Sequence, residues 1–271
     1  RLVSSEVAAA APETLPPPKG AHELQNDALR LVFAGAEQGF DCIGIENRLV
    51  DNTRFVHSRD EAPGLWRLEF RTPYQAVPEG SDKKEHEKLL LDNRAEGKRT
   101  AKVTQTADGQ LLTLTWQGLA LGDEPGVIDV TATVLLKKGA GESEWRIKID
   151  NRSKVFGLWE ASYPLLSTMA PRGTADVLVP SGNWGGKLWK KCKGSFGSAY
   201  PSGACPVQFM AFNLGQAGIY FGAHDPGARA KSVRLSANQD ATFATYAENM
   251  GVPGSDVAAP FPVVLSAYRG N

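Results

Sequence analysis

The sequence predicts an almost entirely β protein, built as one large antiparallel sandwich. Short segments in which apolar and polar residues alternate follow one another from about Leu24 to the end of the 271-residue chain. No long stretch between them shows the 3.6-residue period of an amphipathic helix. Sandwiches and barrels of ~250 residues are common as single domains, so one large sandwich is favoured over two small ones.

The alternation is clearest at residues 65–71, where Trp66, Leu68 and Phe70 are separated by arginine or glutamate. Residues 145–149 repeat the pattern with a tryptophan and two isoleucines. Each segment has one face to bury and one to expose, as a half-buried strand requires. The same interpretation fits residues 29–34, 112–117, 128–136, 208–214 and 217–223. Together with the turn residues between them, these patterns predict roughly sixteen to eighteen strands.

The first residues have a different composition. An alanine run at residues 8–11 and several prolines up to Pro18 give no face that a core could bury. We therefore expect residues 1–21 to be a tail or linker and residues 22–271 to be the sandwich domain. Because the chain begins at Arg1, the tail is either the mature end left after removal of a signal peptide or an arbitrary boundary.

The composition excludes two classes of partner. Thirty basic and thirty acidic residues leave a formal net charge of zero, so nothing predicts binding to nucleic acid. No stretch approaches the ~20 apolar residues of a membrane-spanning helix, so no membrane partner is expected. A hydrophobic content of 42% is enough for a continuous core.

The three cysteines leave two alternatives open. Cys192 and Cys205 stand at the two ends of a loop rich in glycine and serine, whereas Cys42 lies in an apolar strand segment. If the protein is exported, a disulfide between Cys192 and Cys205 is expected; otherwise all three are inert thiols.

Two local patterns predict loops. Asp108 and Gly109 are expected to form a two-residue turn between residues 102–106 and 111–117, because Asp-Gly favours tight hairpins. Residues 81–88 carry six charged side chains and no apolar stripe, which indicates a solvated loop or a short helix.

The longest segment without alternation, residues 180–206, is the first candidate binding site. Long irregular connections are uncommon in compact domains and often functional. Flat aromatic rings stack on the apolar faces of sugars, which makes Trp184, Trp189 and Tyr200, with Asn183 as a hydrogen-bonding neighbour, a candidate carbohydrate platform. The alternative is that both tryptophans fill the open end of the sandwich as core.

The second candidate is the end of the apolar segment 217–223, where His224 and Asp225 precede Pro226. The two side chains form either a proton-transfer pair that also binds carbohydrate, or a turn in which Asp225 caps the backbone.

Several segments resemble a known family. Residues 24–33 and 39–47 look like the opening hairpin of a β-supersandwich, and residues 179–180, 200–201, 207–212 and 218–225 agree with it. These motifs resemble the N-terminal domain of bacterial proteins related to glycoside hydrolases. The resemblance implies a galactose-mutarotase-like fold, usually followed by a (β/α)8 barrel with the catalytic carboxylates. Such a barrel would be a partner domain in the same polypeptide.

Catalysis by this chain alone is not expected. Glycoside hydrolysis requires two carboxylates about 5–10 Å apart, and Glu160 and Asp225 are the only pair we consider. Glu160, in an apolar segment, either has a raised pKa or makes a structural hydrogen bond. No cluster with metal-ligand spacing and no nucleotide-binding or nucleophile motif occurs, so no metal or cofactor is expected.

Three functions therefore remain open. We favour a noncatalytic carbohydrate-associated domain of a larger glycosidase, secreted or periplasmic, with carbohydrate as ligand. A free-standing mutarotase that uses His224 and a carboxylate is the alternative, and a sandwich that binds only other proteins is a third possibility.

Overall fold

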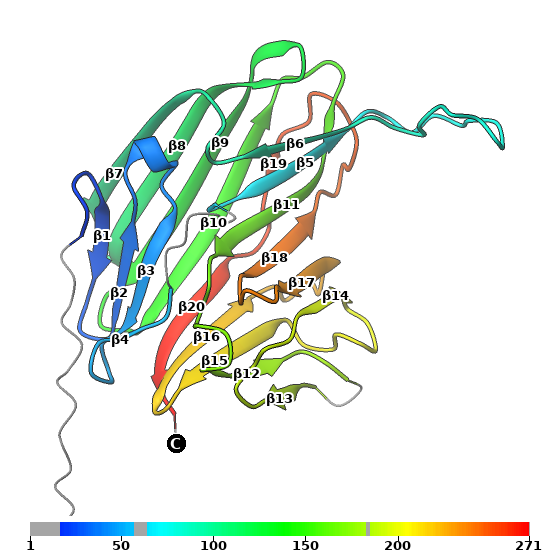
Figure 1. Ribbon diagram of the computed structural model, residues 1–271. Helices are drawn as coiled ribbons and strands as arrows, with labels where there is room; N and C mark the ends of the chain where they lie inside the picture. Colours follow the sequence, from blue (N-terminus) through cyan, green and yellow to red (C-terminus); the bar gives the residue numbers. More distant parts are fainter. Residues whose placement is uncertain (1–16, 57–63, 183–184, 271) are drawn as a thin grey trace, which may run out of the picture.

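The prediction of an all-β protein is confirmed by a computed structural model, which describes residues 17–56, 64–182 and 185–270 (Figure 1). These residues form twenty strands and one short 3₁₀ helix, η1 (Ala36–Gln38). The number of strands exceeds the sequence count because two-residue strands are too short to show alternation. None of the described residues belongs to a helix long and apolar enough to cross a membrane.

The strands form three antiparallel sheets. The ten-stranded sheet contains, in spatial order, β13 (Lys187–Trp189), β12 (Asp176–Val179), β15 (Phe209–Leu214), β16 (Ala217–Ala223), β20 (Val263–Arg269), β10 (Glu142–Asn151), β9 (Glu124–Lys137), β8 (Gly109–Leu121) and β7 (Lys98–Gln105), with β19 (Val257–Ala258) paired to β10. The six-stranded sheet contains β14 (Phe196–Tyr200), β17 (Lys231–Leu235), β18 (Ala241–Tyr246), β11 (Gly157–Leu166), β5 (Arg67–Arg71) and β6 (Lys88–Asp92). The four-stranded sheet contains β1 (His22–Gln25), β2 (Leu29–Phe33), β3 (Cys42–Asn47) and β4 (Thr53–Arg54).

The core lies between the ten-stranded sheet on one side and the two smaller sheets on the other (Figure 1). Aromatic rings join the layers: Phe33 of β2 contacts Trp145 of β10 at 5.4 Å between ring centroids, and Phe221 of β16 contacts Phe243 of β18 at 5.0 Å. All four side chains are fully buried, so one continuous apolar core supports all three sheets.

The hairpin between β7 and β8 forms with a two-residue turn, as expected, but its position is shifted by one residue. Thr106 N–H donates to Gly109 C=O at 2.8 Å, so Ala107 and Asp108 occupy the turn. Gly109 already belongs to β8, and a Cβ atom there would lie only 2.0 Å from the carbonyl oxygen of Leu136 on β9. Close strand packing and the positive φ of 147° therefore both favour glycine at this position.

The strand at residues 29–34 departs from the expected alternation, because all five residues of β2 are buried. Its polar residue, Arg30, is only 5% exposed and lies between Glu23 and Glu46, with an N–O distance of 2.8 Å to each carboxylate. An arginine paired in this way tolerates burial.

Residues 72–87 form an arm that projects away from the sandwich between β5 and β6 (Figure 1). Thr72 N–H donates to Glu87 C=O, and Gln75 N–H donates to Glu85 C=O. The charged residues of the arm are mostly exposed, and none of them belongs to a helix. The prediction of a solvated loop is therefore confirmed for residues 81–87, and β6 begins at Lys88.

Candidate functional site

Asp225 follows β16 and lies in a buried ionic cluster. Its carboxylate accepts hydrogen bonds from the backbone N–H groups of Gly227 (3.0 Å) and Arg229 (2.7 Å). The Arg229 guanidinium donates at 2.7 Å and the Lys231 ammonium at 2.9 Å. The side chains of Asp225 and Lys231 are both fully buried. These contacts hold the turn after β16 in place, which is the capping role considered from the sequence.

The charges in this cluster shift both pKa values. Burial by itself would raise the pKa of Asp225, but hydrogen bonds from Lys231 and from the Arg229 backbone lower it below its ordinary value. Burial lowers the pKa of Lys231, and pairing with Asp225 only partly opposes this effect. A carboxylate with a low pKa and four donors is poorly suited to accept a proton from a substrate.

His224 does not join Asp225 as a proton-transfer pair. Its side chain is exposed, and its Nε2 atom lies 3.2 Å from the Tyr220 hydroxyl. Both residues follow the end of β16 at Ala223, and the His224 side chain is exposed while the Asp225 side chain is buried in the cluster. Of the two alternatives considered from the sequence, the structure therefore supports the turn capped by Asp225 and not the His224–Asp225 proton-transfer pair.

Glu160 also has a structural partner. On β11, its two carboxylate oxygens each accept a hydrogen bond of 2.7 Å from Arg234 of β17. Its side chain is 13% exposed. The interpretation of Glu160 as a structural hydrogen-bonding group is thus the one the structure supports, and Glu160 and Asp225 are each paired with different basic residues.

The aromatic platform is only partly visible, because Asn183 and Trp184 lie outside the described residues. Trp189 ends β13, is half-buried and packs against the apolar core. Tyr200 ends β14, is half-buried, and has the buried Lys231 ammonium 4.6 Å from its ring centroid. Both described rings therefore contribute to packing, which is the alternative considered for Trp189.

We expect Trp189→Ala to lower the free energy of unfolding by about 2 kcal/mol, less than the cost of deleting a fully buried tryptophan. Chemical denaturation of the parent and the variant measures this loss. An unchanged stability would mean that the ring is free for ligand binding after all.

The disulfide considered for an exported protein is not formed. Cys42, Cys192 and Cys205 are all free and buried. The Cys192 thiol lies 3.9 Å from the carbonyl oxygen of Gly194, whereas the Cys205 thiol lies 3.6 Å from that of Val207. Burial raises the pKa of Cys205 to about 11 and that of Cys42 to about 12, which keeps these thiols protonated and unreactive.

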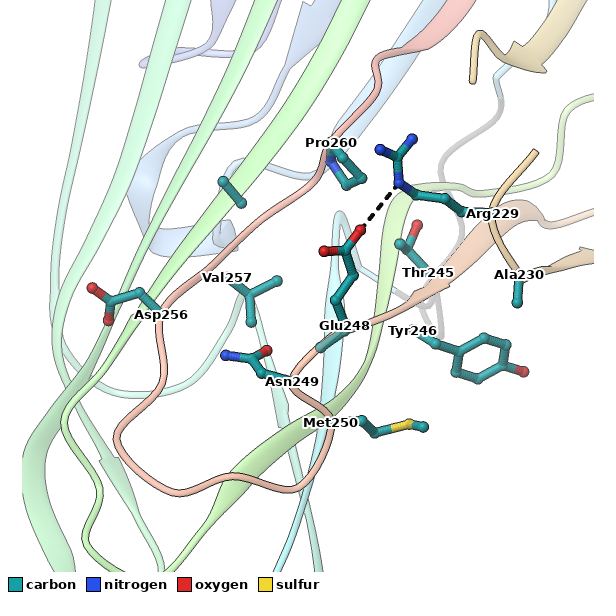
Figure 2. A pocket seen from close by; sticks show the side chains of 12 residues that line it. Arg229, Ala230, Thr245, Tyr246, Glu248, Asn249, Met250, Asp256, Val257 and Pro260 are labelled. Carbon is teal, nitrogen blue, oxygen red and sulfur yellow. Dashed lines mark hydrogen bonds and ion pairs between the residues drawn. The ribbon is translucent and has the colours of Figure 1, made fainter. Parts of the chain in front are cut away.

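A pocket that the sequence analysis did not identify opens where β18 ends (Figure 2). Its volume is about 650 Å³, and the connection from β18 to β19 forms much of its wall. The polar groups on this wall are Glu248, Asn249 and Asp256, and the apolar groups are Met250, Val257 and Pro260. Residues 247–256 contain two glycines and a proline without any motif of known chemistry, so only the fold brings these side chains together.

The pocket is connected to the buried cluster through Arg229. Arg229 Nε lies 3.2 Å from Glu248 Oε1 (Figure 2). The Nη1 atom of the same guanidinium donates to Asp225. Glu248 is 80% exposed, so its carboxylate also faces solvent at the rim. At the other end of the β18–β19 connection, Asp256 accepts a 2.9 Å hydrogen bond from Asn151 N–H, which fixes that carboxylate next to β10. Glu248 and Asp225 both raise the pKa of Arg229, which therefore stays charged.

This arrangement combines a few hydrogen-bonding groups with an apolar surface, which suits a small ligand with hydroxyl groups on one side and C–H groups on the other. Two carboxylates, an amide and a guanidinium supply acceptors and donors for hydroxyl groups. None of the described residues around the pocket is a histidine, and no group of three or more metal-ligating side chains occurs in the described parts of the chain.

Comparisons with solved structures show the class of fold. The chain matches an α-N-acetylgalactosaminidase, NagBb, from Bifidobacterium bifidum, bound to N-acetylgalactosamine, with a TM-score of 0.59 and 8% identity over 92% of this chain and 36% of that one. It matches an α-galactosidase from Lactobacillus brevis with a TM-score of 0.54 and 12% identity over 95% of this chain and 41% of that one. It matches a galactose 1-epimerase from Lactobacillus acidophilus with a TM-score of 0.56 and 9% identity over 92% of this chain and 94% of that one.

The fold is therefore the galactose-mutarotase-like β-sandwich that the resemblance implied. The chain spans about a third of the NagBb chain, 36%. No family model matches the sequence, and neither does any curated protein.

Proposed function

We propose that this chain is a noncatalytic carbohydrate-binding domain of a larger glycoside hydrolase, and that the pocket at the end of β18 binds the sugar. The observation that carries the proposal is the composition of that pocket. Glu248, Asn249 and Asp256 offer hydrogen bonds to hydroxyl groups beside the apolar Met250 and Val257. Neither carboxylate considered for catalysis lines this pocket, because Asp225 is paired with Arg229 and Lys231 and Glu160 is paired with Arg234.

The two glycosidases support the idea of a larger protein, because this chain matches only 36% and 41% of their lengths. In the proposal, a following barrel carries the catalytic carboxylates and the sandwich binds or orients the sugar. An exported location belongs to the same proposal. Galactose and N-acetylgalactosamine are the first probes to test, because the names of the matched proteins refer to these sugars.

A mutarotase is the alternative, favoured by the match to 94% of the galactose 1-epimerase chain. General acid and base catalysis at the ring oxygen and the anomeric hydroxyl would require two groups within hydrogen-bonding reach of one sugar. His224, the histidine considered for this role, contacts Tyr220 instead of a carboxylate.

Removal of the Glu248 carboxylate at the rim distinguishes sugar binding in this pocket from nonspecific binding of sugar elsewhere on the protein. We expect Glu248→Ala to weaken sugar binding about tenfold or more, because a hydrogen bond between a hydroxyl group and a carboxylate is lost. Calorimetric titration with galactose and with N-acetylgalactosamine gives the dissociation constants of the parent and the variant.

Glu79→Ala, in the exposed arm, is the matched control and should leave binding unchanged. Equal affinities of the parent and Glu248→Ala for a sugar that both bind would place the binding site elsewhere. If the parent binds neither probe, carbohydrate binding by this pocket loses its support.

A further inference from the structure

The strand β6 (Lys88–Asp92) is the outer strand of the six-stranded sheet and has an unusual edge. Its sequence is Lys-Leu-Leu-Leu-Asp, apolar in the middle and oppositely charged at its two ends. Leu90, at the centre, is 57% exposed, against 47% for the next most exposed leucine of the described residues, Leu188. Natural edge strands are commonly protected by bulges, prolines or inward charges. The pairing of β6 with β5 continues over all five residues without a bulge.

The hydrogen-bond pattern of β5 determines which backbone groups of β6 face outward. Thr72 N–H donates to Glu87 C=O at the start of the ladder. Bonded residues recur at every second position of an antiparallel ladder, so Leu89 and Leu91 bond to β5. The other side of β5 shows the same alternation. There, Leu165 of β11 donates its N–H to the C=O of Leu65, an odd-numbered residue, whereas the even-numbered Thr72 bonds toward β6. The backbone N–H and C=O groups of Lys88, Leu90 and Asp92 therefore point toward the free edge.

We propose that β6 pairs with β6 of a second copy of this chain, antiparallel, about a two-fold axis at Leu90. In this register Leu90 lies opposite Leu90 of the second copy, and each Lys88 lies opposite an Asp92. The three residues whose backbone groups face outward are the three that find partners. The pairing joins the two six-stranded sheets into one continuous sheet, an isologous contact of the kind typical of two-fold dimers.

Charge complementarity selects this register over its neighbours. A shift of the axis to Leu89 or Leu91 places a charged residue opposite Leu90 and leaves the other charged residue without an opposite partner. A further shift that centres the pairing on Lys88 or Asp92 places two like charges opposite each other, which is destabilising in a sheet. Only the axis at Leu90 matches the leucines and both pairs of opposite charges.

The contacts at the two ends of β6 are compatible with a second copy. The arm at residues 72–87 connects the end of β5 to the start of β6 at Lys88 and projects away from the sandwich (Figure 1). Lys88 already forms an ion pair with Glu69 on the same face, and Asp92 C=O accepts a hydrogen bond from Ala95 N–H. A carbonyl oxygen has a second lone pair, so the latter contact is compatible with pairing across the axis.

Disulfide trapping tests the register directly. Leu90→Cys places two thiols opposite each other at the axis, and mild oxidation should link the chains rapidly into dimers. Leu188→Cys, on the outer strand β13 of the other large sheet, is the matched control. The three native cysteines are at most 4% exposed, so they should not contribute.

Charge variants test the complementarity in solution. Lys88→Asp and Asp92→Lys should each weaken the dimer measured by sedimentation, about tenfold or more in the dissociation constant. An equal mixture of these two variants should form a dimer again, because every position 88 then lies opposite a residue of opposite charge at position 92. Thermal melts confirm that the variants are folded.

Three results would overturn the proposal: a parent chain that sediments only as a monomer, a Leu90→Cys variant that links no faster than Leu188→Cys, or a mixture of charge variants that associates no better than either variant alone. A parent dimer that is trapped by Leu90→Cys and restored by mixing supports it.

Discussion

Lys231→Met is expected to lower the free energy of unfolding by about 3–5 kcal/mol, because it leaves the buried Asp225 carboxylate without its buried cation. Both side chains are fully buried, and the Nζ–Oδ2 distance is 2.9 Å. The ammonium group also lies 4.6 and 4.7 Å from the ring centroids of Tyr200 and Phe261, so two aromatic contacts are lost as well. Urea denaturation of the parent and the variant measures the difference.

The double variant Asp225→Asn with Lys231→Met separates the cost of an unpaired charge from the cost of lost packing. If the unpaired charge dominates, the double variant should be more stable than Lys231→Met alone. A double variant that is less stable than Lys231→Met would contradict this explanation.

The same cluster predicts a dependence on pH. The folded state lowers the pKa of Asp225 below its ordinary value of 3.8. The stabilisation by Asp225 is therefore fully present above the unfolded pKa and is lost as the pH falls through the lower folded pKa. The parent should lose stability more steeply than the double variant in this acidic range.

Asn93→Ala is expected to lower the free energy of unfolding by about 3 kcal/mol, because its buried amide joins segments of different sheets. Its Oδ1 atom accepts from Leu65 N–H at 2.8 Å just before β5, and its Nδ2 atom donates to Gly39 C=O at 2.7 Å before β3. Deletion of the amide leaves a buried donor and a buried acceptor without partners. Trp116 Nε1 of β8 bonds the backbone carbonyl of Asn93, so this contact should remain.

Asn238→Ala, at an exposed turn, is the control and should change the stability little. Denaturation midpoints that fall equally for both variants would show that the hydrogen bonds of the Asn93 amide do not contribute the expected stabilisation.

The alternation of side chains was sufficient to predict an antiparallel all-β sandwich, whereas the galactose-mutarotase-like fold was implied only by the resemblance of short motifs. Residues 217–223 match β16 at both ends, because a strand packed between two others carries its apolar pattern in consecutive residues. The pattern failed at β2, where Arg30 is buried by ion pairs with Glu23 and Glu46. Such pairing depends on residues up to sixteen positions away and leaves no period in the sequence.

The candidate site was predicted less well, for a related reason. The sequence drew attention to His224 beside Asp225, but after the end of β16 the His224 side chain is exposed while the Asp225 side chain is buried. Arg229 and Lys231, which bind Asp225, follow it by four and six positions, and no motif in the sequence shows these contacts. The pocket brings together β18, β19 and the segment before β17, and a sequence without a motif cannot show which strand ends meet.

The most direct test of the proposed function is a proton NMR time course of freshly dissolved α-galactose with the parent chain and saturation of the protein signals. If the chain binds the sugar without catalysis, saturation should pass from the protein to the sugar, while the β anomer appears at the rate seen without protein. Faster appearance of the β anomer would identify a mutarotase, and absence of saturation transfer would contradict carbohydrate binding with this probe.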